Sequence, residues 1–394
     1  MKITVPTIDF GTSKIVTMVA QSNGERCDMV GSGAVPYSGY LQDGWNNPDE
    51  IRDVIRTAID QAQKTGNCRI HELNVGVPGM FTRVIVKEVH VSLTGPDPHV
   101  TAQDVRACFK LAEESGGDRI IHSAPAWFRV DDGKKTLSPV GIKGRELSAM
   151  IALVTADKYF IDDITYRLRD MDIEPREFYS TVAGEATYAL SQDERDKTAM
   201  LIDIGYLCTD VMVMEGDALI FHKCLDIGGG HISADIAEQL NIPFPFVEEK
   251  IKQTYSFNST NQDETYVIPA TEDEPARTVR RDEVTPIIEA KVEEIAEAIN
   301  KALEEGGVKL GKWSNVYLTG GGLILNKGGK DFLAGKLHRI IREAQRTNNK
   351  MTSHVFSSAV GLTILVVTTQ EEQKAPEGGA KGLFSRAFRW LMGY

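Results

Sequence analysis

The chain has 394 residues, of which 42% are hydrophobic and 25% charged, and its formal net charge is -12. This length predicts two or three folding units, each able to bury a sizeable core. The acidic balance argues against non-specific nucleic-acid binding, because duplex recognition needs Lys and Arg to neutralise phosphates. We therefore expect no nucleic-acid partner.

The cysteines are odd in number and contain no CxxC pair: Cys27, Cys68, Cys108, Cys208 and Cys224. Their spacing predicts neither a zinc site nor a disulfide framework, so buried thiols in a reducing cytosol are expected. The N-terminus has no apolar segment of signal-peptide length, and no run of about 18 apolar residues occurs along the chain. We expect a protein that is neither exported nor membrane-spanning.

Apolar strand-like runs alternate with helix-like segments, which is the pattern of α/β proteins. ITVPTIDFG, KIVTMVAQ and DMVGSGAVP predict a strand meander, and residues 48–66 an amphipathic helix ended by Gly66. Residues 79–154 break this rhythm with a strand, a helix with Thr101 at its N-cap and Asp104 in its first turn, and two further strands. They predict a small inserted subdomain within a first subdomain of residues 1–78 and 155–195.

The opening motif then returns, since IDFGTSKIVTMV is matched by IDIGYLCTDVMV, each a strand, an Asp-x-Gly turn and a return strand. This repeat predicts a second subdomain of residues 196–253 and 311–370, with a cleft between the two halves. Residues 254–310 are expected to form its small subdomain and to contain a helix at 286–305 with one apolar stripe. VYLTGGGLILNKGG predicts a strand that runs into a triple-glycine turn.

The turn DFGTSK carries groups suited to phosphate. Gly11 allows close approach, Thr12 and Ser13 supply donors, Lys14 supplies charge, and Asp9 is placed to orient the water shell of Mg²⁺. Taken alone, this turn and the later LTGGG are equally compatible with plain structural turns. Their joint presence with the repeat favours one nucleotide site.

Two stretches compete as the second phosphate loop, IDIGYLCTD and the glycine-richer LDIGGGHISADI. Asp203 ends a first strand and begins a hairpin, as Asp9 does, whereas Asp226 follows a third strand. Residues 203–210 are therefore the predicted loop, and glycines 228–230 are expected to begin a helix near the nucleotide.

In this order, IDFGTSK, IDIGYLCTD, DIGGGHISADIAEQL, FVEEKIKQTY and VYLTGGGLILNKGG resemble the actin-like ATPase superfamily. The insert and the C-terminal segment narrow the resemblance to the FtsA family of bacterial cell-division proteins. The insert residues that carry it are His122, Pro125, Phe128, Asp132, Gly133, Pro139, Gly141 and Gly144. The resemblance covers nearly the whole chain and implies an actin-like, ribonuclease H-like two-domain α/β fold that binds ATP or ADP with Mg²⁺ between its domains.

The resemblance also implies residue roles. The first phosphate loop would be Asp9, Gly11, Thr12, Ser13 and Lys14, and the second would retain Asp203, Gly205 and Thr209. Gly229 and Gly230 would approach phosphate or ribose, Glu249 and Lys252 would bracket ribose and base, and Gly320, Gly321 and Gly322 would form the adenosine loop. Asp9 and Asp203 would hold Mg²⁺ through water. An exposed helix face is the alternative for Glu249 and Lys252.

The second loop departs from the family pattern Asp-x-Gly-Gly-Gly-Thr-Thr-Asp, because Tyr206, Leu207 and Cys208 replace Gly-Gly-Thr. Bulky residues adopt positive φ only at a cost. Thr181 stands where related ATPases carry a water-positioning acid, and Glu185 follows one turn later. We expect slow or absent hydrolysis, with weak catalytic candidates at Asp9, Thr181, Glu185 and Asp203.

The C-terminus predicts a flexible linker at residues 371–380 and an amphipathic helix at 381–394. Its apolar side chains fall on one face of roughly 160° on a helical wheel. The helix has arginines but no acid, which favours docking on anionic lipid over burial in a core. The expected membrane-facing residues are Leu383, Phe384, Arg386, Phe388, Arg389, Trp390 and Leu391.

By resemblance, the chain would be a polymerising actin homologue on the cytoplasmic face of the cell membrane at the division site. Its partners would be the C-terminal tail of FtsZ, docked on residues 254–310, further copies of itself, and other division proteins. Arg280, Arg281 and Lys291 are candidates to meet acids of that tail, with solvated surface as the alternative. Two further alternatives stay open, a nucleotide-independent membrane adaptor and a type IV pilus assembly protein of the same superfamily.

Overall fold

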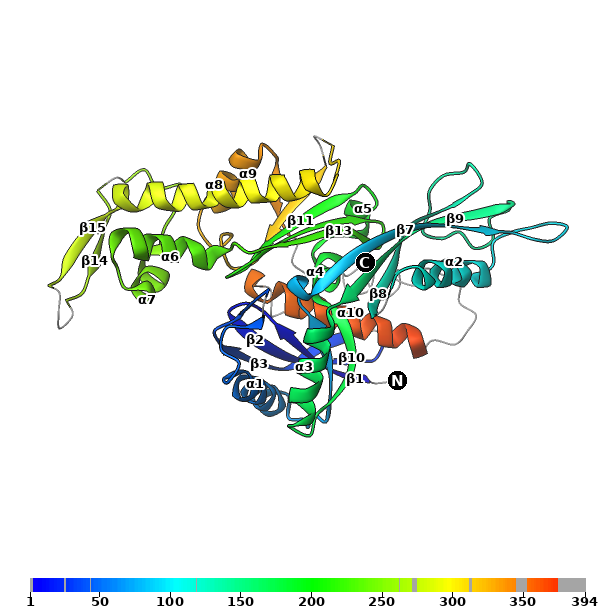
Figure 1. Ribbon diagram of the computed structural model, residues 1–394, viewed down its shortest axis with the longest axis horizontal. Helices are drawn as coiled ribbons and strands as arrows, with labels where there is room; N and C mark the ends of the chain where they lie inside the picture. The colour runs from blue at the N-terminus through cyan, green and yellow to red at the C-terminus, as the bar shows by residue number, and fades with distance from the viewer. Residues whose placement is uncertain are drawn as a thin grey trace. The chain divides into compact units, whose positions relative to one another are not determined.

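The computed structural model describes residues 3–24, 26–42, 44–117, 119–261, 263–270, 275–311, 314–344 and 353–374. The chain divides into two compact units (Figure 1). The first comprises residues 1–199, 212–222 and 345–394, and the second residues 200–211 and 223–344. Among helices in these described ranges, none is both long and apolar enough to cross a membrane.

A five-stranded sheet of order β10-β6-β1-β2-β3 forms the centre of the first unit. Its strands are β1 (Ile3–Phe10), β2 (Lys14–Ser22), β3 (Cys27–Pro36), β6 (Glu72–Val77) and β10 (Glu174–Ser180). The first three pair antiparallel as the predicted meander, while β6 pairs parallel with both β1 and β10. The short pair β4 (Tyr40–Leu41) and β5 (Gly44–Trp45) follows the meander.

Helices cover both faces of this sheet, because successive strand side chains point to opposite faces. Outside residues 79–156, the helices of the first unit are α1 (Ile51–Gly66), α3 (Lys158–Arg169), α4 (Thr181–Ala189), α5 (Gln192–Arg195) and α10 (Ser357–Lys374), with a 3₁₀ turn at His354–Phe356. Ile8 and Phe10 pack in one core with α1 and α3, whereas Ile3 and Val5 pack in another with α10. Gly33 lets α1 approach closely, since a Cβ there would lie 2.1 Å from the Ala58 carbonyl oxygen.

The insert begins with a 3₁₀ turn at Gly79–Phe81 and forms its own three-stranded sheet of order β7-β9-β8. Its elements are β7 (Thr82–Ser92), α2 (Ala102–Glu114), β8 (Ile120–Val130) and β9 (Glu146–Ala156). Thr101 caps α2 through a reciprocal pair of hydrogen bonds with Asp104, as its sequence predicts. A separate hydrophobic core joins α2 to these strands.

A second five-stranded sheet has the order β13-β12-β11-β16-β17. Its strands are β11 (Ala199–Ile204), β12 (Thr209–Glu215), β13 (Ala218–Leu225), β16 (Asn315–Thr319) and β17 (Ile341–Glu343). The helices of the second unit are α6 (Gly229–Leu240), α7 (Phe244–Phe246), a π-helical turn at Val247–Lys252, α8 (Arg281–Glu305) and α9 (Gly329–Leu337). A hairpin of β14 (Thr265–Ile268) and β15 (Arg277–Arg280) precedes α8.

Several predicted boundaries differ from the observed ones. Asn67, with φ 46°, takes the left-handed position after α1, whereas Gly66 is its last helical residue. Helix α8 begins at Arg281 rather than at residue 286, because Glu283 accepts a hydrogen bond from the Arg280 N–H (2.9 Å) and caps an earlier start. Of the cysteines expected to be buried, only Cys108 and Cys208 are, and the other three are half-buried.

The last described helix, α10, differs most from expectation. It was predicted as the end of the second half, but Leu362, Leu365 and Val366 pack on the first sheet. It also continues to Lys374, beyond the start of the predicted linker at residue 371. The apolar side chains of α10 are buried against the first sheet. This packing stabilises the helix, so that it continues into the polar segment.

Candidate functional site

The first loop joins β1 to β2 through a tight turn. The Gly11 N–H donates to the Lys14 carbonyl (3.1 Å), and the Tyr37 hydroxyl donates to the Gly11 carbonyl (2.8 Å). Thr12 is buried and Ser13 half-buried, while the Lys14 ammonium lies 5.1 Å from the centre of the Phe356 ring. These contacts fix the backbone that the sequence predicts to face phosphate.

Asp9 is a buried carboxyl group at the end of β1. The Ser358 hydroxyl of α10 donates to its Oδ2 atom at 2.6 Å. Burial nevertheless raises its pKa to about 6, although Ser358 and Lys14 both lower it. A buried carboxylate of this kind is stabilised by a nearby cation.

In the second unit, the loop from Asp203 to Thr209 is bonded to the start of α6. The Gly205 N–H donates to the Cys208 carbonyl (2.9 Å), which closes the loop. The N–H groups of Gly229 and Gly230 donate to the carbonyls of Gly205 (2.9 Å) and Tyr206 (2.7 Å). The two glycine amides expected to meet phosphate or ribose therefore hold the neighbouring loop.

Thr209 anchors the far end of that loop from within the core. Its buried hydroxyl donates to the Ile227 carbonyl at 2.7 Å. Glycines 228–230 begin α6 as predicted, and the Gly228 N–H donates to Nδ1 of His231 (3.0 Å). Position in the repeat, rather than glycine content, correctly separated the hairpin loop from the helix start.

The triple-glycine turn after β16 packs directly on the second loop. Gly320 has φ +87°, and a Cβ there would lie 2.1 Å from Oδ1 of Asp203. Gly322 donates its N–H to the Ile204 carbonyl (2.8 Å), and a Cβ there would lie 2.3 Å from the Gly205 carbonyl oxygen. Gly321 is half-buried between them. Three loops thus converge around Asp203, namely residues 203–209, 228–230 and 320–322. The last two were predicted from their glycines.

Tyr206 turns its ring toward α6. A Cβ at Gly230 would lie 3.0 Å from carbon atoms of this ring, and the Lys252 ammonium lies 5.8 Å from its centre. Burial raises the pKa of the Tyr206 hydroxyl. Tyr206, which interrupts the glycine pattern, therefore occupies space beside Lys252. The sequence alone does not predict the direction of this side chain.

Lys252 is paired with Glu248 instead of Glu249. Its ammonium lies 3.1 Å from Oε1 of Glu248, whose other oxygen accepts from the Ser233 hydroxyl (2.5 Å). Glu249 is exposed. A π-helix closes i→i+5 hydrogen bonds, so its wider turn brings residues four apart, and not three apart, onto the same side.

The candidates on α4 are held in the first unit's core. The Thr181 hydroxyl donates to the Val77 carbonyl (3.0 Å), and both Thr181 and Glu185 are buried. A Cβ at Gly361 would lie 2.6 Å from the Cα atom of Glu185, so α10 crosses α4 at this point. Thr181 thereby has a structural role at the end of β6.

Two of the three basic residues expected at the partner surface are engaged internally. Arg281 is only 3% exposed and pairs with Glu264 (2.9 Å), and Lys291 pairs with Asp235 (2.9 Å). Arg280 is exposed and pairs with Asp282. The predicted membrane residues, Leu383 to Leu391, lie outside the described residues.

Sequence reasoning missed a cavity of about 690 Å³ in the first unit. Arg119, His122 and Ser123 line one part of it, and Glu177 and Tyr179 another. Burial lowers the pKa of His122 to about 4, so this imidazole is neutral at pH 7. No motif signals the cavity, because its lining comes from segments that are distant in the chain.

Two family models match this chain, "Cell division protein FtsA" over residues 200–361 and "SHS2 domain inserted in FTSA" over residues 79–155. Together they cover more than half of the sequence, and the second coincides with the predicted insert. The chain belongs to the FtsA family. FtsA of Pseudomonas aeruginosa is 24% identical over 412 residues, which span 98% of this chain and 97% of that protein.

Solved structures share the fold of this FtsA-family chain at low sequence identity. A type IV pilus biogenesis complex of PilM and PilN matches with a TM-score of 0.62 and 16% identity, covering 93% of this chain and 99% of that one. MreB5 of Spiroplasma citri, bound to ADP, matches with a TM-score of 0.55 and 11% identity, covering 95% and 99%. The predicted actin-like α/β fold with an FtsA-type insert is confirmed.

Proposed function

We propose that this FtsA-family protein binds ATP with Mg²⁺, polymerises on the cytoplasmic face of the membrane, and tethers FtsZ to it at the division site. The convergence of three loops on Asp203 carries the nucleotide part of the proposal. At Gly320 a side chain of any size would collide with Asp203, so the glycine turn packs directly on the Asp203 loop and a side chain there would displace it. Structures of MreB5 with ADP and with AMPPNP support the same use of this fold.

By the family resemblance, Asp9 and Asp203 would each face Mg²⁺ through water, since this ion prefers oxygen ligands and keeps several of its waters. Asp9 is buried and its pKa is raised to about 6, so a divalent cation would offset the cost of its charge at neutral pH. When bound, the ion would neutralise phosphate charge. Lys14 and the Thr12 and Ser13 hydroxyls would contact phosphate oxygens.

Slow or absent hydrolysis remains our proposal. The glycine amides that a phosphate loop would offer are bonded within the second unit, and Tyr206 fills the space beside Lys252. Thr181, in the place of a water-positioning acid, cannot act as a base and is bonded to Val77. The loop is thus built to hold a nucleotide more than to activate water.

Titration with a fluorescent ATP analogue in Mg²⁺ tests nucleotide binding. Wild type should bind, Gly320→Ala should lose at least tenfold in affinity, and Gly335→Ala should bind as wild type, because a Cβ at Gly335 meets nothing within 4 Å. Absence of binding by wild type would favour the nucleotide-independent adaptor. Brisk Mg²⁺-dependent phosphate release would contradict the proposed slow hydrolysis.

The fold similarity to PilM keeps a pilus-assembly role as a second candidate. The FtsA-type insert at residues 79–155 supports cell division instead. Co-pelleting with FtsZ polymers distinguishes the two, since only a division protein should pellet with wild-type FtsZ and remain soluble with FtsZ that lacks its C-terminal tail.

A further inference from the structure

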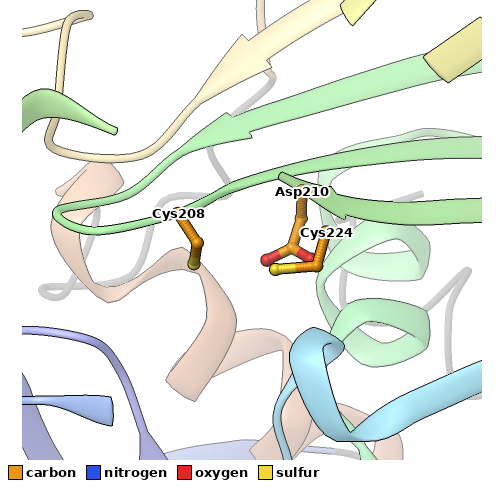
Figure 2. Close-up of side chains that lie close together, drawn as sticks. All are labelled: Cys208, Asp210 and Cys224. Carbon is orange, nitrogen blue, oxygen red and sulfur yellow. The ribbon is translucent and has the colours of Figure 1, made fainter. Parts of the chain in front are cut away.

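Two cysteines and one aspartate form a cluster in the second unit. The Sγ atoms of Cys208 and Cys224 and a carboxylate oxygen of Asp210 all lie within 4.8 Å of one another. Figure 2 shows the three side chains on the same side of two strands. Cys208 is buried and the other two are half-buried, so the cluster is shielded yet accessible to an ion.

The strand geometry places these side chains together. Cys208 immediately precedes β12, and Asp210 lies two residues later, so both project from the same face of extended chain. Cys224 lies near the end of β13, which neighbours β12 in the sheet. Asp210 and Cys224 are therefore held by sheet pairing, and Cys208 is held at the end of the Asp203–Thr209 loop, directly before β12 begins.

We infer that Cys208, Asp210 and Cys224 form a binding site for one Zn²⁺ ion, with a fourth position open to water. Two thiolates and one carboxylate are a donor set that zinc accepts in tetrahedral geometry, whereas Mg²⁺ requires oxygen ligands. With Zn–S bonds of about 2.3 Å, tetrahedral coordination separates two sulfurs by roughly 3.8 Å. The observed separations of at most 4.8 Å are within about 1 Å of this spacing.

Binding of Zn²⁺ releases protons from the two thiols. The two thiols ionise, each Sγ forms a bond to the ion, and two protons pass to solvent. The Cys208 carbonyl accepts the hydrogen bond that closes the Asp203–Thr209 loop (2.9 Å from the Gly205 N–H). Zinc would therefore tie the end of this loop to β13 and restrict its motion.

Cobalt substitution tests the site without any nucleotide. The full chain, reduced and freed of metal with a chelator, is titrated anaerobically with Co²⁺ and then with Zn²⁺. Wild type should develop thiolate-to-cobalt charge-transfer and tetrahedral ligand-field absorption that saturates at one equivalent and disappears with Zn²⁺. Cys208→Ser and Cys224→Ser should each weaken cobalt binding at least tenfold, and Cys108→Ser, which alters a buried thiol of the insert, should bind as wild type.

Protection of the thiols from alkylation tests the site in the wild-type protein, and so does not require a serine variant that folds. In wild type, Zn²⁺ should protect Cys208 and Cys224 from alkylation, as located by peptide mass spectrometry, while Cys27, Cys68 and Cys108 react equally with and without metal. Asp210→Asn should reduce that protection. The inference is overturned if cobalt gives no thiolate band, if the band survives both cysteine changes, or if the two thiols form a disulfide that metal does not prevent.

Discussion

At the scale of single residues, Asp9 shows how burial changes a side chain that the sequence marks only as acidic. Its pKa is raised to about 6 from a usual value of 3.8. Between these two values the folded protein binds more protons than the unfolded chain, so the contribution of Asp9 to stability falls as pH rises. Above pH 6 the full cost of a buried charge is present.

Asp9→Asn should therefore raise the stability of the nucleotide-free protein at pH 7.5 relative to pH 4.5 by about 2 kcal/mol, because titration between pH 4.5 and about 6 costs roughly 1.4 kcal/mol per pH unit. Urea unfolding of both proteins at the two pH values measures this difference. Ser358→Ala removes the hydroxyl that donates to Asp9 and should move the pH dependence to higher pH. Equal effects of Asp9→Asn at both pH values would contradict the prediction.

Glu248 and Glu249 form a matched pair for testing the contact to Lys252. Glu248→Gln should weaken binding of a fluorescent ATP analogue about tenfold, because the buried ammonium loses its charged partner. Glu249→Gln alters an exposed side chain and should change affinity less than twofold. The reverse result would restore the Glu-x-x-Lys assignment that the family resemblance implies.

At the scale of elements, the crossing of α4 and α10 depends on two glycines. A Cβ at Gly361 would lie 2.6 Å from the Cα atom of Glu185, and one at Gly184 would lie 2.9 Å from the Gly361 carbonyl oxygen. Neither helix has room to accept a methyl group without separating. This contact holds Ser358, and hence Asp9, in place.

Gly361→Ala should lower the free energy of unfolding by about 1–3 kcal/mol, the usual cost of overpacking a core. Gly335→Ala, in the exposed part of α9, is the control and should stabilise by up to about 1 kcal/mol through helix propensity. Thermal unfolding followed by circular dichroism compares the two. An unchanged melting temperature for Gly361→Ala would mean that the helices separate at no cost.

At the scale of the whole molecule, the proposed membrane role depends on many copies acting together. One short amphipathic helix binds lipid reversibly, but a filament presents many, so avidity makes recruitment depend on polymerisation. The segment itself, residues 381–394, lies outside the described residues, and its role is argued from sequence. Nucleotide binding and lipid binding should therefore be separable.

A chain truncated after Gly379 should lose co-sedimentation with vesicles of anionic lipid and keep binding the ATP analogue. Arg389→Glu combined with Trp390→Ala should have the same effect, because it removes both charge attraction and an apolar anchor. Vesicles of neutral lipid serve as the control and should bind wild type weakly. Unchanged sedimentation of the truncated chain would refute the role of this helix.

Local patterns were sufficient for much of the fold. The changed pattern of residues 79–154 predicted the insert, and Thr101 and Asp104 predicted the start of α2. The two Asp-x-Gly hairpins predicted the repeated strand order of the two large sheets. These features depend on interactions between residues that are close in the chain. Such interactions can be predicted from hydrophobic periodicity and from capping residues.

The sequence by itself determined the family, the fold class and the order of the glycine loops, because these depend on local spacing. Only the tertiary structure decided which residues meet: Glu248 with Lys252, Gly320 with Asp203, α10 with the first sheet, and Cys208 with Cys224. Each of these contacts joins segments through sheet pairing, helix pitch or burial. Spacing rules cannot predict such contacts. The cysteines form no CxxC pair, and the sequence therefore did not predict that the thiols of Cys208 and Cys224 lie close together.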